Sequence, residues 1–530
     1  MQLHACAASC YEFQQKLLLK LQQKLVFFMG YVVNRLNCLY RFLVFRVNPF
    51  WIHVCYFTLL SVACFLFLKA MGWRDPTYST PNAFDLFFMA VSSATIASNS
   101  TVEMEVFSDT QLLVITIFML LGGEVFTSMI DLQLAKTRYY DSLDRHHSTE
   151  SGEIELGPMS TDVDGELMVA KSAGDQIQYL RYNCVRYLTM AVLAYFLAVQ
   201  LVGILSILAY VTVVPSARRV LEKKGLDRQV FSVFTAVSAF ANCGFVPTNE
   251  NMVVFRRNSG LLLTIIPLVL LGNTLFPPCL RLLIWVLRRT SPRAEFDYML
   301  QKPEEIGYYH LLRPLHCLYL VPTVAGFLVV QFTLFTVMEW DSEGLRGMTP
   351  FQKLVGALFQ SANTRHGGQW VVDLSKLAPA VLFLSVVMMY LPPYTSFSPI
   401  VEDERGSTEL GMVQRLLLSQ LSYLFICTVL ICITENEKIS EDPVNFNVFN
   451  IIVEVVSAYA NVGFSTGYSC KRQLKPNRYC KDAWYGFVGR WSKKEDNNLP
   501  GATDCNKYNT FSREDNNLLA SADDGPKVAI

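Results

Sequence analysis

The sequence predicts an all-α integral membrane protein, in which four pseudo-repeats of helix, pore loop and helix surround one central pore and the last helix is missing. Hydrophobic residues make up 52% of the 530 residues and charged residues only 17%, a composition unlike that of soluble proteins. A bilayer-spanning helix needs about 20 mostly apolar residues. Seven runs meet or approach this length, at residues 51–68, 112–130, 184–214, 261–287, 317–337, 378–390 and 416–433.

One short motif recurs four times along the chain. Residues 237–245 read VSAFANCGF and residues 456–464 read VSAYANVGF, while related stretches occupy residues 90–92 and 365–368. The apolar segments leading into these motifs are too short to span a bilayer, and they cover residues 84–90, 230–240, 351–359 and 448–459. Non-helical backbone at membrane depth is tolerated only where protein buries it or where it lines a water-filled cavity. Each motif therefore predicts a short re-entrant helix followed by an extended loop.

The residue types in these loops point to cation permeation. A cation that sheds its water needs fixed oxygens in exchange, and a ring of backbone carbonyls can supply them. Glycine adopts the backbone angles that such a ring demands without steric cost, and Gly244, Gly368 and Gly463 stand at matching places. Ser92 takes the equivalent place in the first loop. We therefore predict an ion selectivity filter of these four residues, in which replacing Ser92 by Gly raises K+ permeability relative to Na+.

Four polar residues beside the loops are predicted to support the filter: Asn242, Arg365, His366 and Asn461. Arg365 and His366, together with Asp373, could shape the electric field at the filter, but a local salt bridge that buttresses the loop is the favoured interpretation.

Glu124 is an acid inside an apolar run. Ionisable groups within the membrane are candidates for function, whereas a structural pairing with a neighbouring loop is the alternative.

A candidate inner gate lies at the end of the sixth apolar run. The segment from 388 to 393 reads MMYLPP, and proline lacks the backbone donor that would continue a helix. The gate candidates are Met388, Tyr390, Pro392 and Pro393, and a plain helix end is the alternative. If the segment is a gate, replacing both prolines by Ala alters the current without shifting selectivity.

Charge and loops divide the chain into seven segments. They are a cytoplasmic basic N-terminal arm (1–48), repeat 1 (49–133), a polar, mobile cytoplasmic linker (134–183), repeat 2 (184–290), repeat 3 (291–395), an incomplete repeat 4 (396–490) and a divergent polar, disordered tail (491–530). The basic arm places the N-terminus in the cytoplasm and the pore loops outside, although the basic loop at residues 218–228 conflicts with this topology. Cys470 and Cys480 could form a disulfide if their segment is extracellular.

Longer motifs around the loops resemble the plant HKT family of cation transporters, relatives of the Trk and Ktr potassium transporters. They read STVEMEVFS (100–108), GGEVF (122–126), FANCGFVPTNEN (240–251), NTRHGG (363–368) and NVGFSTGY (461–468). The resemblance covers about residues 49–491 and implies filter positions at Ser92, Gly244, Gly368 and Gly463. A serine in the first position resembles the Na+-selective subfamily. The third loop departs from the pattern, because Gln369 stands where relatives commonly carry Glu. The resemblance also implies an inner gate and a homodimer.

The leading hypothesis is a passive, Na+-selective transporter of the plasma membrane. The alternatives are a K+/Na+ transporter and a non-conducting truncated isoform that modulates intact relatives. The chain carries 45 basic and 45 acidic residues, which gives no reason to expect nucleic acid as a partner. No cofactor, no metal beyond the permeating Na+ or K+ and no enzymatic activity are expected. The bilayer is the other expected partner.

The fourth repeat lacks the closing helix that the pattern requires. Residues 493–530 contain no long apolar run and repeat the letters EDNN, a composition that cannot cross about 30 Å of hydrocarbon. From the sequence we expect poor conduction by this chain alone. Robust Na+ current from the chain as written would contradict that expectation.

Overall fold

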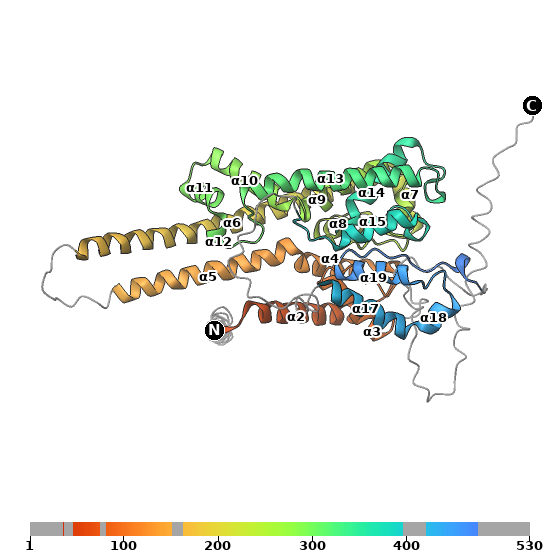
Figure 1. Ribbon diagram of the computed structural model, residues 1–530, viewed down its shortest axis with the longest axis horizontal. Helices are drawn as coiled ribbons and strands as arrows, with labels where there is room; N and C mark the ends of the chain where they lie inside the picture. The colour runs from red at the N-terminus through yellow and green to blue at the C-terminus, as the bar shows by residue number, and fades with distance from the viewer. Residues whose placement is uncertain (1–34, 36–45, 75–80, 151–162, 396–419, 475–530) are drawn as a thin grey trace, which may run out of the picture.

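The computed structural model describes residues 35, 46–74, 81–150, 163–395 and 420–474, with backbone alone for 141–150 and 163–175. Every secondary-structure element in this part of the chain is a helix (Figure 1), which confirms the all-α prediction. The α-helices are α2 (Pro49–Ala70), α3 (Ala83–Ala94), α4 (Asp109–Gly122), α5 (Glu124–Glu150), α6 (Val163–Val213), α7 (Pro215–Lys223), α8 (Arg228–Ala241), α9 (Ser259–Gly272), α10 (Phe276–Thr290), α11 (Ala294–Gln301), α12 (Pro303–Ile306), α13 (Pro314–Glu339), α14 (Pro350–Thr364), α15 (Pro379–Tyr390), α17 (Gln420–Thr434), α18 (Asn436–Glu441) and α19 (Val448–Tyr459).

Among the described residues, three helices, α2, α6 and α13, are long and apolar enough to cross a membrane. The bent pairs α4–α5 and α9–α10 raise the number to five if each pair counts as one span. Helices α15 and α17 have 12 and 15 residues and are apolar but shorter. The seven predicted runs thus fall on helices, apart from residues 416–419, which lie outside the described residues.

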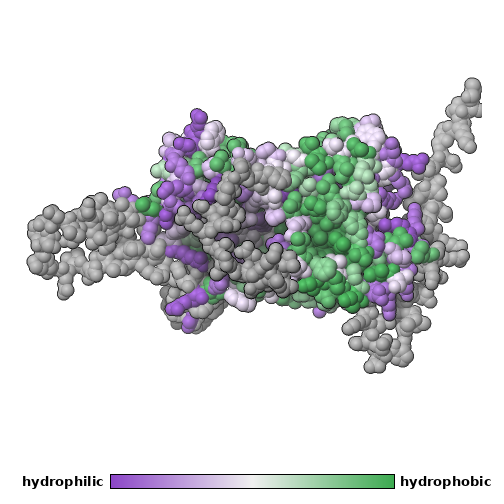
Figure 2. All heavy atoms as spheres, viewed as in Figure 1, coloured by the Kyte–Doolittle hydropathy of each residue, from purple (hydrophilic) through white to green (hydrophobic). Residues whose placement is uncertain are grey.

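The surface matches a bilayer. Figure 2 shows an apolar band across one face, with hydrophilic residues on both sides of it. Large apolar side chains are exposed along α2, α6, α13 and α17, for example Leu59, Leu201, Val329 and Phe425. In water such a surface would be unfavourable, so these helices face lipid.

The four short helices predicted before the loops are α3, α8, α14 and α19. Each is followed by a loop and then by a 3₁₀ helix: η1 (Met104–Val106), η2 (Asn251–Phe255), η4 (Leu374–Lys376) and η5 (Cys470–Arg472). A fifth 3₁₀ helix, η3 (Glu343–Leu345), lies outside this order. Cys470 is disulfide-bonded, whereas Cys480 lies outside the described residues.

Two predicted spans are broken in the structure. The helix axis bends by 49° between α4 and α5 and by 80° between α9 and α10. At both breaks a glycine meets the end of a short helix, because a Cβ on Gly122 would lie 1.9 Å from the carbonyl oxygen of Ala94, and one on Gly272 would lie 1.8 Å from that of Phe240. Beyond the second break α10 begins with prolines, which cannot continue the hydrogen-bond ladder.

The described parts of the predicted linker at 134–183 are helical, since α5 continues to Glu150 and α6 begins at Val163. Helices α5 and α6 run side by side beyond the membrane-facing part of the molecule (Figure 1), and the rings of Tyr140 and Tyr182 lie 6.0 Å apart. Buried Leu132 continues the apolar face of α5 and packs in one cluster with Cys184 and Leu188 of α6. These buried apolar residues hold α5 and α6 together where the two helices enter the polar part of the sequence. Residues 151–162 and the tail at 491–530 lie outside the described residues.

The basic loop that conflicted with the topology lies on the same side of the molecule as the segments after the first two pore loops. Lys224 Nζ lies 2.8 Å from Glu105 Oε1 and 2.7 Å from Glu250 Oε2. Figure 1 places α7 far from α11 and α12 along the long axis. One basic residue of this loop is thus paired with two acids from the segments that follow the first and second pore loops.

The close approach of α9 to the end of α8 yields a stability prediction. Gly272→Ala puts a Cβ within 1.8 Å of a backbone oxygen, and we expect destabilisation of about 3 kcal/mol or more, since overpacking a core typically costs about 1–3 kcal/mol. Gly326→Ala is the matched control, because no heavy atom lies within 4 Å of a Cβ at that position. Thermal denaturation of the detergent-purified variants measures the difference, and equal melting temperatures would contradict the packing argument.

Candidate permeation site

Four residues in the left-handed backbone region mark the four loops. Ser98, Gly244, Gly368 and Gly463 have φ values of 65°, 77°, 69° and 79°. Each lies three or four residues beyond the last residue of α3, α8, α14 or α19. Side chains rarely tolerate this conformation outside glycine, so four occurrences at the same place indicate one backbone design used four times.

The four loops adjoin one another. A Cβ on Gly244 would lie 2.8 Å from the Cα of Gly368, and one on Gly463 would lie 2.0 Å from the Cβ of Ser98. A Cβ on Gly368 would lie 1.9 Å from the carbonyl oxygen of Val462. Segments separated by more than 300 residues in sequence therefore meet backbone to backbone. The three predicted glycines are brought together as expected.

Ser92 is not at this meeting point, which corrects the prediction for the first loop. It lies inside α3, is only 2% exposed, and its hydroxyl has no hydrogen-bond partner. Ser98 takes the place beside Gly463. The apolar segment was expected to end at Ala90, but the helix continues to Ala94. Counting four residues from the true helix end, as in the third and fourth loops, leads to Ser98.

Polar residues within the short helices brace the loops, and sequence reasoning missed them. Ser238 Oγ in α8 donates to the carbonyl oxygen of Phe245 at 2.7 Å. In α19, Glu454 Oε1 accepts from Ser465 Oγ at 2.8 Å and from Thr466 N at 3.0 Å. In both repeats the brace comes from the preceding helix and holds backbone just past the glycine. In the sequence, the signal for these contacts was a polar residue, such as Ser238 or Glu454, within an otherwise apolar short helix.

The second and third loops are also joined to each other. Asn251 Nδ2 donates to the carbonyl oxygen of Gly244 at 3.3 Å, and its Oδ1 accepts from Trp370 N at 3.1 Å. Gln360 Oε1 in α14 accepts from Val371 N at 3.1 Å. A single buried amide thus ties two loops together, which fixes their spacing.

The predicted supports Asn242 and Asn461 occupy equivalent positions two residues before a loop glycine. Their φ values are 57° and 53°, and Asn242 caps α8 while its Nδ2 donates to the carbonyl oxygen of Phe240 at 3.2 Å. Asparagine is the side chain that enters the left-handed region most readily after glycine. Their observed role is to end the short helix and turn the chain into the loop.

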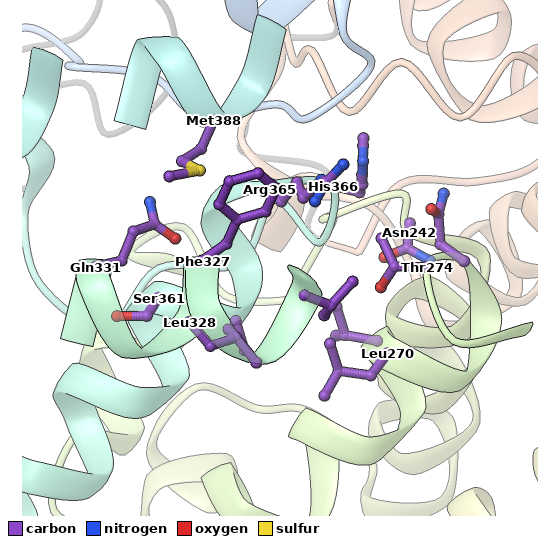
Figure 3. A pocket seen from close by; sticks show the side chains of 14 residues that line it. Asn242, Leu270, Thr274, Phe327, Leu328, Gln331, Ser361, Arg365, His366 and Met388 are labelled. Atoms are coloured by element: carbon purple, nitrogen blue, oxygen red, sulfur yellow. The ribbon is translucent and has the colours of Figure 1, made fainter. Parts of the chain in front are cut away.

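Arg365 and His366 line a cavity between α9, α13 and α15, together with Asn242 and Met388 (Figure 3). Within the described residues no carboxylate pairs with Arg365, so the local salt bridge expected there stays a prediction. The carboxylate of Asp373 accepts instead from its neighbour Ser375, at 2.6 Å from the hydroxyl. His366 is buried, and its Nε2 has no partner.

The gate candidates follow the helix end at Tyr390. Met388 is buried and points into the cavity of Figure 3, whereas Tyr390 stacks on Tyr459 of α19 with ring centroids 6.4 Å apart. The carbonyl oxygens of Pro392 and Pro393 accept hydrogen bonds from Arg365. The proline segment does end its helix, as α15 stops two residues before Pro392.

Glu124 is paired across the two helix breaks. Asn273 Nδ2, at the break after α9, donates to Glu124 Oε2 at 3.3 Å, just past the break after α4. This contact supports the alternative interpretation that Glu124 has a structural role. The contact links the helices that follow the first and second loops.

A second cavity adjoins the glycines on the side that carries the 3₁₀ helices. Its lining includes Ser98, Gly244 and Gly463 together with Thr248 and Ser465.

The ion-paired trio of Lys224, Glu105 and Glu250 lies near this cavity, since Asn249, one of its lining residues, accepts from Glu105 N at 3.1 Å. Burial lowers the pKa of Lys224, but hydrogen bonds to both glutamates outweigh it, so the net pKa is raised and the ammonium remains charged.

Chemically, the site is a meeting of four backbone loops, with one cavity lined by Ser98, Gly244 and Gly463 and another lined by Asn242, Arg365 and His366. In the described part of the chain, no group of three or more His, Cys, Asp or Glu side chains could hold a metal ion. The polar lining of the cavity beside Ser98, Gly244 and Gly463 consists of backbone, hydroxyls and amides, and their oxygens are hard ligands suited to alkali cations in transit. The fold and the site define a membrane protein of the cation-transport class.

The comparisons with known proteins agree with this class. The sequence model of the family described as TrkH, cation transport protein, matches residues 166–397 and 407–480, and the chain belongs to this family. The chain is 44% identical over 462 residues to "Cation transporter HKT1;3" of Oryza sativa subsp. japonica, covering 85% of this chain and 87% of that one. It is 46% identical over 440 residues to "Sodium transporter HKT1" of Arabidopsis thaliana, covering 79% and 85% respectively.

Among solved structures, the chain is similar to the potassium transporter TrkH from Vibrio parahaemolyticus, with 12% identity, a TM-score of 0.43 and coverage of 78% of this chain and 76% of that one. The family membership confirms the resemblance found in the sequence. It also confirms a transporter rather than an enzyme.

The crowding at the loop glycines predicts a sharp loss of transport. Gly463→Ala combines a φ of 79° with a Cβ only 2.0 Å from the Cβ of Ser98, so we expect no measurable cation current. Gly307→Ala has a similar φ of 69° but nothing within 4 Å, and it serves as a control for backbone strain alone. Voltage-clamp currents, normalised to surface protein, check this expectation. Wild-type current from Gly463→Ala would rule out a tight ring at this position.

Proposed function

We propose that the chain carries Na+ passively through a selectivity filter formed by the backbone of Ser98, Gly244, Gly368 and Gly463. The observation that carries the proposal is the meeting of four left-handed loops, with no room for a Cβ at three of them. Carbonyls fixed at such a point can replace the hydration shell of a small cation.

Two observations support Na+ as the ion. One relative at 46% identity carries the name "Sodium transporter HKT1". In addition, the first loop contributes Ser98 where the other three contribute glycine. The Ser98 side chain lies against Gly463, where a Cβ would be only 2.0 Å from the Cβ of Ser98, so the first loop places a side chain where the other three loops place only backbone.

The proposed architecture is a fourfold arrangement of pseudo-repeats at residues 49–133, 184–290, 291–395 and 396–490. Its support is the recurring order of short helix, loop and 3₁₀ helix. We further propose a plasma-membrane location and a homodimer, which follow from the family resemblance. The gate role of residues 388–393 belongs to the same proposal.

Exchange of the first-loop serine tests the ion selectivity. Ser98→Gly should shift the reversal potential in mixed Na+ and K+ solutions toward K+ permeation, because the loop loses its only side chain at the ring. Ser92→Gly is the matched control, since that residue is buried within α3, and its reversal potential should equal that of the wild type. The opposite outcome, a shift for Ser92→Gly alone, would return the filter position to Ser92. A wild-type reversal potential that follows K+ would support the K+/Na+ alternative, and absence of current would support the non-conducting one.

A further inference from the structure

We propose that Arg365 is a positioning residue that clasps the chain break after α15 to the third pore loop and thereby sets how often the pathway opens. This inference rests on the proposed function, because it concerns the opening of the same pathway. It differs from a filter role, since the guanidinium reaches away from the glycines toward the gate candidates.

The clasp is a direct contact between the third pore loop, which carries Arg365, and the segment after α15, which carries Pro392 and Pro393. Arg365 directly follows α14 and stands three residues before Gly368. Its Nη2 donates to the carbonyl oxygen of Pro392 at 2.5 Å and to that of Pro393 at 3.2 Å. The carbonyl oxygen of Pro392 also accepts from Thr395 N at 3.2 Å and from Thr395 Oγ1 at 2.8 Å, so Arg365 joins a local turn after α15 to the third loop.

The surroundings of the guanidinium explain why this contact matters. Arg365 is 7% exposed, its charge lies over the ring of Phe327 at 5.0 Å, and its Nε and Nη1 have no hydrogen-bond partner. Figure 3 shows Arg365 and Phe327 together at the cavity that Met388 also enters. A buried cation with unsatisfied donors is costly. It therefore favours any arrangement of the break that offers it carbonyls, and the arrangement described here offers two.

Tyr394, the residue after the two prolines, is held by two histidines that lie before or at the start of α13. The hydroxyl of Tyr394 lies 2.7 Å from His310 Nδ1, and its carbonyl oxygen lies 3.1 Å from His316 Nε2. Both histidines precede or begin α13. The segment is thus fixed at Tyr394 and clasped at Pro392 and Pro393. Loss of the Arg365 contacts leaves the two Tyr394 contacts in place. Pro392 and Pro393 can then move while Tyr394 stays fixed.

The chemistry of arginine distinguishes a clasp from a simple positive charge. A guanidinium is a planar fork that can bond two oxygens at once, whereas a lysine ammonium is a compact point charge on a flexible stem. Arg365→Lys keeps the charge and loses the fork. Arg365→Gln loses both the charge and the reach.

Single-channel recording of the full chain in oocyte patches tests the clasp. We expect Arg365→Lys and Arg365→Gln both to change the open probability by about threefold or more, the effect of losing one net hydrogen bond. Unitary current and reversal potential should stay at wild-type values. Arg288→Gln, which removes a half-exposed cation paired with Asp297, is the control and should match the wild type. Normal behaviour of Arg365→Lys with a changed unitary current in Arg365→Gln would overturn the clasp in favour of an electrostatic role.

A labelling experiment separates failure of the clasp from failure of the proposed function, because it requires no current. Leu391→Cys is introduced with and without Arg365→Gln, and the rate of thiol modification is measured in membranes by mass spectrometry of the peptide. Release of the clasp should raise that rate at least about threefold, matching the hydrogen-bond estimate. Equal rates in the two backgrounds would refute the clasp, whatever ion the protein carries.

Discussion

The structure depends on one constraint: four segments of one chain must bring their backbones together where side chains do not fit. A left-handed φ turns each loop so that it enters the meeting point, and Gly244, Gly368 and Gly463 accept this angle without steric cost. The constraint extends outward from the ring. Helix ends approach the helices behind them so closely that Gly122 and Gly272 are required at the contacts. The loops cannot move apart without loss of these contacts.

Buried polar groups hold this arrangement, since an unpaired backbone group in an apolar interior is costly. Glu454 and Ser238 extend from their helices to the following loops, and Asn251 joins two loops with one amide. Farther from the ring, the breaks in the helices are tied together as well. Asn273 bonds Glu124 across two breaks, and Arg365 takes up the carbonyls at the third. The first two helix breaks are therefore bonded to each other, and the third is bonded to the third loop.

Most of the fold was predictable because its signals are local. Long apolar runs give spanning helices, short apolar runs before Gly-rich loops give re-entrant helices, and Pro392 ends α15 as expected. The prediction failed where a helix ran on past its apolar stretch. This happened at α3, which led us to propose Ser98 rather than Ser92 for the filter, and along α5 and α6, which stay helical beyond their apolar runs. Helix ends depend on packing as well as on composition, and packing is not visible in one segment.

The sequence by itself determined the class of protein, the apolar runs that form helices and the three glycines that meet in the loops, because hydropathy and backbone freedom are properties of residues and their near neighbours. Only the tertiary structure decided which serine joins those glycines and what Arg365 binds. The acceptors of that guanidinium are backbone carbonyls 27 and 28 residues away. A carbonyl is present at every residue, so no sequence pattern marks the one that will be used. Which carbonyl accepts from Arg365 depends on which backbone segment the fold places beside the guanidinium.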